Sequence, residues 1–371
     1  MAVERALARS RDRFSAPRHT GRRIRLMIVD DSTVARAVLS RMVESDPVFE
    51  ITAVAGTAED AIEALGECRV DVVILDLEMP GAGGLKSIPR IIAAAAGARI
   101  MIVSSLAEDG AEQTVAALAL GATDTMPKPG TGRFNGKFSE ILLNKLKALG
   151  YASDQSPPLV AQKAGPHAAL RAMPSDPIGV LAIGASTGGI HALGVLFSAL
   201  PARIGVPILV TQHLPIPFMN VFARQLGAVA RRDALVAEDG MRLLPDQILI
   251  APGDAHLTLE PGQSGPVVRL THGRGGSGCM PSVDPMLASI GAIYGAGGLG
   301  VVLTGMGRDG VEGAARLVAC GGSILAQDES SCAVWGMPRA ILEAGLACAV
   351  LPPEKIARRI ASRTEEPPAC K

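Results

Sequence analysis

The hydrophobic pattern of residues 24–149 alternates between short apolar runs and longer amphipathic stretches. The apolar runs predict buried strands at 25–30, 48–55, 70–75, 99–104 and 123–126. The amphipathic stretches carry apolar residues at helical spacing and predict helices at 32–45, 58–67, 85–96, 109–120 and 136–149. Five consecutive strand–helix units predict an α/β domain with a doubly wound parallel sheet, whose ligands bind beyond the carboxyl ends of the strands.

The second half of the chain repeats this pattern after a change in composition. Residues 151–177 contain five prolines and show no apolar periodicity, which is typical of an extended linker. Buried strands are then predicted at 177–184, 207–213 and 299–304, so the second domain is α/β with a mainly parallel sheet. The predicted organisation is a basic tail, a first domain, a proline-rich linker, a second domain and a C-terminal tail, at 1–23, 24–149, 150–176, 177–363 and 364–371.

Composition and charge narrow the function classes. Basic and acidic residues both number 36, so the net charge is zero, and no basic recognition helix follows the first domain. A nucleic-acid partner is therefore not expected.

The six cysteines are scattered without a C-x-x-C pair, which fits a reducing, cytoplasmic compartment. The sequence contains no run of about 18 strongly apolar residues, so membrane insertion is not expected. The arginine-rich N-terminus is interpreted as a disordered tail, with an organelle transit peptide as the alternative.

Polar residues gather at the predicted carboxyl ends of the strands in the first domain. Asp30 and Asp31 end the first strand, and Asp76 follows the third. Three carboxylates at one edge repel each other, and the oxygen-liganded cation Mg²⁺ relieves that repulsion. Ser104 ends the fourth strand and Lys128 follows the fifth, where a hydroxyl and an ammonium could contact a phosphorylated aspartate.

A candidate nucleophile lies in the turn after the strand at 177–184. Ser186 stands in a G-x-S-x-G sequence between a strand and a helix, the context that exposes a nucleophilic serine. A phosphate-binding loop is the competing interpretation, although the lysine of such loops is absent. Of the histidines, His213 ends a buried strand at the same edge and is the preferred base, and His256 is second. His191 lies roughly 140° around the helix from Ser186 and should not reach it.

The base also needs a carboxylate that orients it. Asp309 lies in a glycine-rich turn after the strand at 299–304, and Asp284 and Asp254 are substitutes. Three strand ends that offer Ser186, His213 and Asp309 suit a catalytic triad. The chain order Ser–His–Asp differs from the Ser–Asp–His order of α/β-hydrolases.

Residues 24–149 resemble the receiver domain of response regulators, which has a flavodoxin-like fold. The resemblance rests on the aspartate pair, Asp76 followed by MPG, Ser104, and Lys128 followed by proline. It implies that Asp76 accepts a phosphoryl group, that Asp30 and Asp31 hold Mg²⁺ with it, and that Ser104 and Lys128 contact the phosphate. It also implies a cis peptide before Pro129. Thr125 stands where the family often carries an aromatic switch residue.

Residues 178–361 resemble the catalytic domain of chemotaxis protein-glutamate methylesterases, the CheB family, which also carry an N-terminal receiver. The matching motifs are GASTGG, TQH, IAPGD, PSVD, LTGMGRDG and AQDESSCAVWGMP. The resemblance implies Ser186 as nucleophile, His213 as general base and acid, Asp309 as orienting carboxylate, and the N–H groups of Met306 and Thr187 as oxyanion donors. Departures are Ile190, where proline is common, and the pair Cys279-Met280 before PSVD.

The resemblance also implies substrates, partners and control. The substrates would be methylated glutamates on the cytoplasmic helices of chemoreceptors, with methanol released and no cofactor needed for hydrolysis. Glutamine deamidation is a second activity that the same acyl-enzyme allows. A chemotaxis histidine kinase would donate the phosphoryl group, and the unphosphorylated receiver would cover the catalytic cleft. The alternative function is a two-component regulator whose second domain is a binding module with an idle triad.

Overall fold

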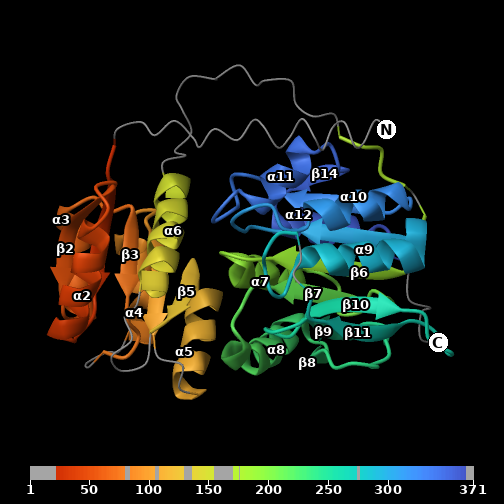
Figure 1. The fold of residues 1–371 in the computed structure, drawn as a ribbon, viewed down its shortest axis with the longest axis horizontal. Helices are drawn as coiled ribbons and strands as arrows, with labels where there is room; N and C mark the ends of the chain where they lie inside the picture. Colours follow the sequence, from red (N-terminus) through yellow and green to blue (C-terminus); the bar gives the residue numbers. More distant parts are fainter. Residues whose placement is uncertain are drawn as a thin grey trace.

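The computed structural model describes residues 22–79, 84–104, 108–128, 136–153, 170–174, 176–273 and 276–364. Three expectations fall largely outside these residues: the basic tail, the proline-rich linker and the C-terminal tail. The peptide bond before Pro129 also lies outside them. The described residues form two α/β units that face each other (Figure 1).

The first unit is a five-stranded parallel sheet covered by helices, in the order β2-β1-β3-β4-β5. Its strands are β1 (Ile24–Val29), β2 (Phe49–Ala55), β3 (Val72–Leu75), β4 (Arg99–Ser104) and β5 (Asp124–Pro127). Its helices are α2 (Thr33–Glu44), α3 (Ala58–Glu67), α4 (Gly84–Ala94), α5 (Glu108–Ala119) and α6 (Gly136–Ser153). Helices on both faces bury the central strands, which explains why β3 is apolar at every position.

Local capping explains where the first helices begin. The Ser32 side chain accepts a hydrogen bond from the Ala35 N–H at the start of α2, and Thr57 caps α3 through the Asp60 N–H. Because Ser32 directly follows the end of β1, this cap turns the chain just beyond Asp30 and Asp31. The acidic pair therefore lies at the carboxyl edge of the sheet.

The second unit contains a seven-stranded sheet in the order β14-β13-β12-β6-β7-β9-β8, in which all neighbours are parallel. Its strands are β6 (Val180–Ala185), β7 (Ile208–Gln212), β8 (Ala234–Val236), β9 (Ile248–Ile250), β12 (Gly298–Val302), β13 (Ser323–Gln327) and β14 (Ala349–Leu351). The antiparallel pair β10 (His256–Glu260) and β11 (Val267–Thr271) stands beside it. The helices are α7 (Gly189–Ala199), α8 (Ile216–Ala230), α9 (Val283–Tyr294), α10 (Val311–Ala319), α11 (Met337–Glu343) and α12 (Pro353–Ala361), with a 3₁₀ turn at Gly295–Gly297.

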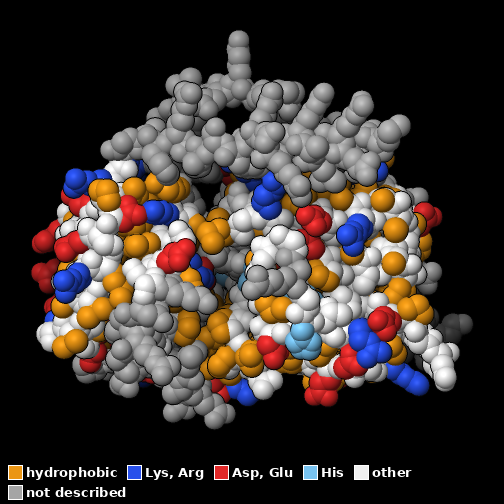
Figure 2. All heavy atoms as spheres, viewed as in Figure 1, with side chains coloured by type: hydrophobic (Ala, Val, Ile, Leu, Met, Phe, Trp, Pro, Cys, Tyr) orange, Lys and Arg blue, Asp and Glu red, His pale blue; other side chains and the backbone are white. Residues whose placement is uncertain are grey.

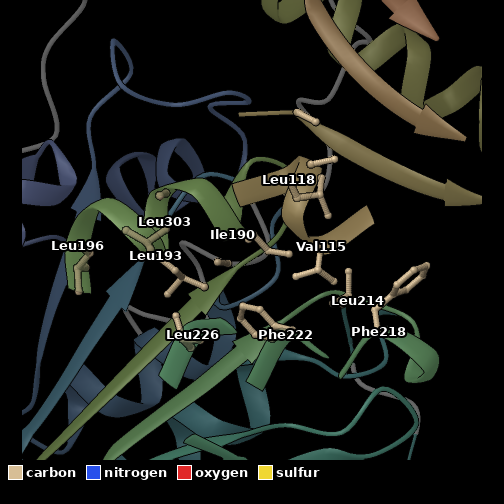
Figure 3. Packing of buried hydrophobic residues seen from close by; sticks show 14 of the residues in the cluster. Val115, Leu118, Ile190, Leu193, Leu196, Leu214, Phe218, Phe222, Leu226 and Leu303 are labelled. Atoms are coloured by element: carbon tan, nitrogen blue, oxygen red, sulfur yellow. The ribbon is translucent and has the colours of Figure 1, made fainter. Parts of the chain in front are cut away.

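The two units pack through α5 of the first against α7 and α8 of the second (Figure 1). Val115 and Leu118 on α5 belong to the same buried apolar cluster as Ile190, Leu214 and Phe218, and Figure 3 shows these side chains meeting between the helices. In the space-filling view, hydrophobic side chains follow the seam between the units (Figure 2). Ile190, one of the departures from the family pattern, is thus buried in the contact between the units.

Candidate active site

The candidate nucleophile stands on a tight turn between β6 and α7. The Ser186 N–H donates to the Thr304 carbonyl at 3.0 Å, which ties the turn to the segment after β12. Gly188 has a φ of +77°, and a Cβ there would meet the Ala333 side chain. A Cβ on Gly189 would meet Gln212 Oε1. The glycines therefore allow the close approach that presents Ser186 at the amino end of α7.

Three of the residues expected to act together are brought into one chain of contacts. His213 Nδ1 lies 3.0 Å from Ser186 Oγ, and His213 Nε2 lies 2.8 Å from Asp309 Oδ2. Ser186 follows β6, His213 follows β7, and Asp309 lies in the loop after β12. These three strands are neighbours in the sheet, in the order β12-β6-β7. With the ring proton on Nε2, His213 donates to Asp309 and leaves Nδ1 free to accept the Ser186 proton. These are the contacts of a Ser–His–Asp triad, with the two ring nitrogens exchanged relative to the usual arrangement, in which Nε2 faces the serine and Nδ1–H faces the aspartate.

The carboxylate of Asp309 is buried and held by two further donors. Ser282 Oγ donates to Oδ1 at 2.6 Å, and the Val283 N–H donates to Oδ2 at 2.7 Å. Burial on its own raises the pKa of Asp309, but the hydrogen bonds and charge of His213 and the bonds from Ser282 and Val283 outweigh it. The pKa of Asp309 therefore lies below its usual range, and the group is a carboxylate at neutral pH.

His256, the second candidate base, lies on the other side of Ser282, and its two ring nitrogens face Ser282 and Gly273 rather than Ser186. Its Nδ1 accepts the Ser282 N–H at 2.9 Å, and its Nε2 faces the Gly273 carbonyl oxygen at 2.6 Å. The ring therefore carries its proton on Nε2 and fixes the backbone of Ser282. Sequence reasoning missed Ser282, although a serine just before an apolar helical run is a helix-start signal, and Ser282 caps α9.

The other candidates take no place in the triad. Asp284 is buried, and its Oδ1 accepts the Gly313 N–H at 2.7 Å. The pKa of Asp284 is raised to about 7, mainly by burial. The negative charge of Asp309 raises it further, and the hydrogen bond from the Gly313 N–H acts in the opposite direction. Asp254 is exposed in the turn after β9. His191 is exposed on α7, where its Nδ1 lies 3.3 Å from the Ala119 carbonyl oxygen.

The two backbone N–H groups expected to bind an oxyanion, those of Thr187 and Met306, belong to segments that lie beside Ser186. A Cβ on Gly305 would lie 2.8 Å from Ser186 Cβ, so the segment that carries Met306 runs directly against the serine. The Gly305 N–H donates to Val334, and its carbonyl accepts from Met337, which fixes this segment. Within the described part of the chain, the N–H groups of Thr187 and Met306 donate to no protein acceptor. Free donors at this place suit an oxyanion hole.

The acidic cluster expected in the first unit forms at the carboxyl edge of its sheet. The carboxylate oxygens of Asp30, Asp31 and Asp76 lie within 4.8 Å of one another, and Lys128 Nζ lies 2.7 Å from Asp76 Oδ2 and 3.0 Å from Asp30 Oδ2. Burial raises the pKa of Asp76, and the hydrogen bond and charge of Lys128 offset part of that rise. A set of carboxylate oxygens at one sheet edge fits Mg²⁺.

Ser104 stands at the end of β4 beside this cluster. Its carbonyl accepts the Lys128 N–H at 2.8 Å, and its Oγ lies 2.6 Å from Thr114 Oγ1. The side chain is buried. It lies at the edge where a phosphate contact is expected, but in this structure its hydroxyl is bonded to Thr114.

The start of β5, in the first unit, lies directly against the turn that carries Ser186. The Gly188 N–H donates to the Thr123 carbonyl at 2.7 Å, and Thr187 Oγ1 donates to Asp124 Oδ2 at 2.7 Å. Thr125 is buried, and its Oγ1 has no partner among the described residues. One pocket is lined from both units, by Leu118, Ala122, Thr123, Asp124, Thr125, Ser186, Gly188, Gly189, Ile190, Gln212, His213 and Leu214. The first unit thus covers Ser186 in this arrangement.

The described helices include none that is both long enough and apolar enough to cross a bilayer. This finding concerns only the residues that the structure describes.

Comparison with known proteins covers both units. Residues 181–360 match the CheB methylesterase family, and residues 26–133 match the response regulator receiver domain. The protein-glutamate methylesterase/protein-glutamine glutaminase 2 of Caulobacter vibrioides is 41% identical over 347 residues, covering 92% of this chain and 99% of that protein. A protein-glutamate methylesterase/protein-glutamine glutaminase 1 of Paramagnetospirillum magneticum is 37% identical over 360 residues, covering 90% and 94%.

A crystal structure of the Thermotoga maritima CheB methylesterase catalytic domain is 35% identical, covers 50% of this chain and 97% of that one, and has a TM-score of 0.48. The two sequence relatives match this chain over nearly their whole length, receiver and catalytic domain together. The chain therefore belongs to the CheB family of protein-glutamate methylesterases/protein-glutamine glutaminases with an N-terminal receiver domain.

Proposed function

We propose that this chain is a serine hydrolase that removes methyl groups from glutamate methyl esters of chemoreceptors, and that phosphorylation of Asp76 controls it. The observation that carries the proposal is the contact from Ser186 through His213 to Asp309, which lie in the segments that follow three adjacent strands. Membership of the methylesterase family supports the same reaction.

The geometry supports a role for each residue in the reaction. Ser186 Oγ attacks the γ-carbonyl carbon of the methyl ester while His213 Nδ1 accepts its proton, and Asp309 stabilises the imidazolium through Nε2–H. The N–H groups of Thr187 and Met306 donate to the oxygen on which negative charge develops. His213 returns the proton to the departing methoxide, which leaves as methanol. Water, activated in turn by His213, then attacks the acyl-enzyme and releases glutamate.

The same site can act on glutamine. Attack of Ser186 on the side-chain amide gives the same acyl-enzyme with ammonia as the leaving group, and water again yields glutamate. The names of the sequence relatives combine both activities, which supports this second reaction.

Control by the receiver follows from its position on the nucleophile turn. Asp30, Asp31 and Asp76 would hold Mg²⁺, which neutralises charge during phosphoryl transfer from a histidine kinase to Asp76. Lys128 then pairs with the added negative charge. Because Lys128 directly follows β5, whose other end contacts Gly188 and Thr187, a change at the phosphate site has a short path to the catalytic turn.

The protein substrate and the setting follow from this activity. The methylated glutamates lie on the cytoplasmic helices of chemoreceptors, so we place the enzyme in the cytoplasm as a partner of those helices and of a chemotaxis kinase. The domain limits that we propose are those expected from the sequence, with the receiver at 24–149 and the catalytic domain at 177–363. Helix α6 runs on to Ser153, into the start of the linker segment.

The test is methanol release from methylated receptor membranes by the full chain, with and without a small-molecule phosphodonor. We expect wild type to release methanol faster with the phosphodonor, and Asp76→Ala to show the same slow rate in both conditions. No methanol under either condition would contradict the methylesterase activity and favour a binding module with an idle triad. Equal wild-type rates with and without phosphodonor would contradict the control by phosphorylation.

A further inference from the structure

A thiol that the proposed reaction does not use lies beside the triad. The ligand atoms of Cys279, His213 and Asp309 all lie within 4.8 Å of one another. Cys279 stands in the segment between β11 and α9, and its side chain is half-buried. We propose that Cys279, His213 and Asp309 form a binding site for Zn²⁺ or a similarly thiophilic divalent cation, and that the bound ion blocks catalysis.

The chemistry of the three donors favours zinc over magnesium. One thiolate, one imidazole nitrogen and one carboxylate oxygen are all common zinc ligands, at about 2.3, 2.0–2.1 and 2.0–2.2 Å from the ion. Three protein ligands leave the fourth tetrahedral position for water. Mg²⁺ prefers oxygen ligands and takes no thiolate, so it would select the Asp30, Asp31 and Asp76 cluster of the receiver instead. The chain thus offers two clusters of different chemistry.

The surroundings of the site already orient two of its ligands. Ser282 Oγ and the Val283 N–H hold the Asp309 carboxylate, and Ser186 Oγ lies against the far nitrogen of the His213 ring. Outer hydrogen bonds of this kind fix ligand orientation in metal sites. His213 Nε2 and Asp309 Oδ2 are now 2.8 Å apart, and two ligands of one tetrahedral zinc lie about 3.3 Å apart, so the pair must open by about half an ångström.

Binding would disable the base, and this consequence rests on the proposed function. The Cys279 thiol loses its proton to solvent when it coordinates the ion. His213 coordinates through Nε2, the nitrogen that faces Asp309, so its single proton must lie on Nδ1. Nδ1 then donates toward Ser186 and cannot accept the serine proton. The nucleophile is left without a base.

The test measures zinc binding directly, by competition with a chromophoric chelator, using the full chain in millimolar Mg²⁺. We expect wild type to bind Zn²⁺ and Cys279→Ala to bind it at least about 100-fold more weakly, since loss of even an outer partner costs 10–100-fold. Cys348→Ala is the matched control, because Cys348 is also half-buried in the same domain, and it should bind like wild type. Cys279→Ser provides a second variant without a thiolate should the alanine variant fail to fold.

The second readout is labelling of Ser186 by a serine-directed phosphonate with and without added Zn²⁺. Zinc should suppress labelling of wild type and of Cys348→Ala, but not of Cys279→Ala. Equal zinc affinity in wild type and Cys279→Ala would overturn the inference, as would failure of wild type to bind Zn²⁺. If Ser186 is not labelled in any variant, the proposed function fails, while chelator competition still decides whether the zinc site exists.

Discussion

Removing the hydrogen bond from Thr187 to Asp124 is the most direct way to weaken the contact between the receiver and the turn that carries Ser186. Asp124 Oδ2 accepts from Thr187 Oγ1 at 2.7 Å across the contact and from Lys145 Nζ at 2.8 Å within the receiver. A hydrogen bond to a charged group contributes about 1.5–3 kcal/mol. Asp124→Ala removes that contribution from the covered arrangement only, since the substitution leaves the catalytic domain unchanged.

This magnitude fixes the expected change in rate. A loss of about 1.5–3 kcal/mol shifts the equilibrium between covered and uncovered forms by about 10- to 150-fold, because each 1.4 kcal/mol is a factor of ten. We expect Asp124→Ala to raise methanol release without phosphodonor by about tenfold or more. The rate of fully phosphorylated wild type sets the upper limit, since there the uncovered form already dominates.

A control variant distinguishes loss of the contact between the two units from a general loss of receiver stability. Lys145→Ala removes the ion pair inside the receiver but leaves the bond between Thr187 and Asp124, so its unphosphorylated rate should stay near that of wild type. Thermal unfolding of both variants reports any general destabilisation. If Asp124→Ala is no faster than wild type while phosphodonor still activates wild type, this bond does not hold the receiver in place. An equal rise in Lys145→Ala would assign the effect to a loosened receiver.

Three further predictions concern the catalytic domain. Ser282→Ala removes the 2.6 Å bond to Asp309 and should lower kcat about tenfold with little change in KM, measured by steady-state methanol release. Gly305→Ala places a Cβ 2.8 Å from that of Ser186 and should lower both kcat and Tm, measured by kinetics and thermal unfolding. Asp284, with its pKa raised from 3.8 to about 7, loses its proton later in the folded than in the unfolded chain, so it costs stability increasingly as pH rises from about 4 to 7. Asp284→Asn should therefore increase the free energy of unfolding at pH 8 by at most about 4 kcal/mol, measured as a higher Tm. At pH 4 the substitution should have little effect.

Each of these has a result that would contradict it. Unchanged kcat in Ser282→Ala would mean that the Val283 N–H alone orients Asp309. A fully active Gly305→Ala would show that the segment carrying Met306 can retreat from the serine without cost. A Tm gain in Asp284→Asn that is equal at pH 4 and pH 8 would place its origin in something other than ionisation.

The sheet edges explain why so much of the site could be predicted from the sequence. Parallel strands end at one edge, so recognising the strands before Ser186, His213 and Asp309 was enough to expect the three side chains together. The same reasoning applied to Asp30, Asp31 and Asp76. The five-stranded sheet and the mainly parallel second sheet, both expected from alternating apolar runs and helices, are confirmed.

Contacts between elements distant in sequence could not be predicted in the same way. His256 could be ranked as a second base but not placed behind Ser282, because that position depends on how β10 packs beside α9. The bond between Asp124 and Thr187 joins two units whose packing leaves no periodic signal in either segment. Cys279 was visible only as a departure from the family pattern, and its approach to His213 depends on the path of the segment before α9.

The central claim is that Ser186 attacks the ester, and the most direct measurement is methanol release from methylated receptor by phosphodonor-activated Ser186→Ala. The account predicts a rate below about 1% of wild type at unchanged thermal stability, since loss of a triad nucleophile costs on the order of 10⁴–10⁶ in kcat. A folded Ser186→Ala that keeps more than about 1% of the wild-type rate would contradict it and require a different nucleophile.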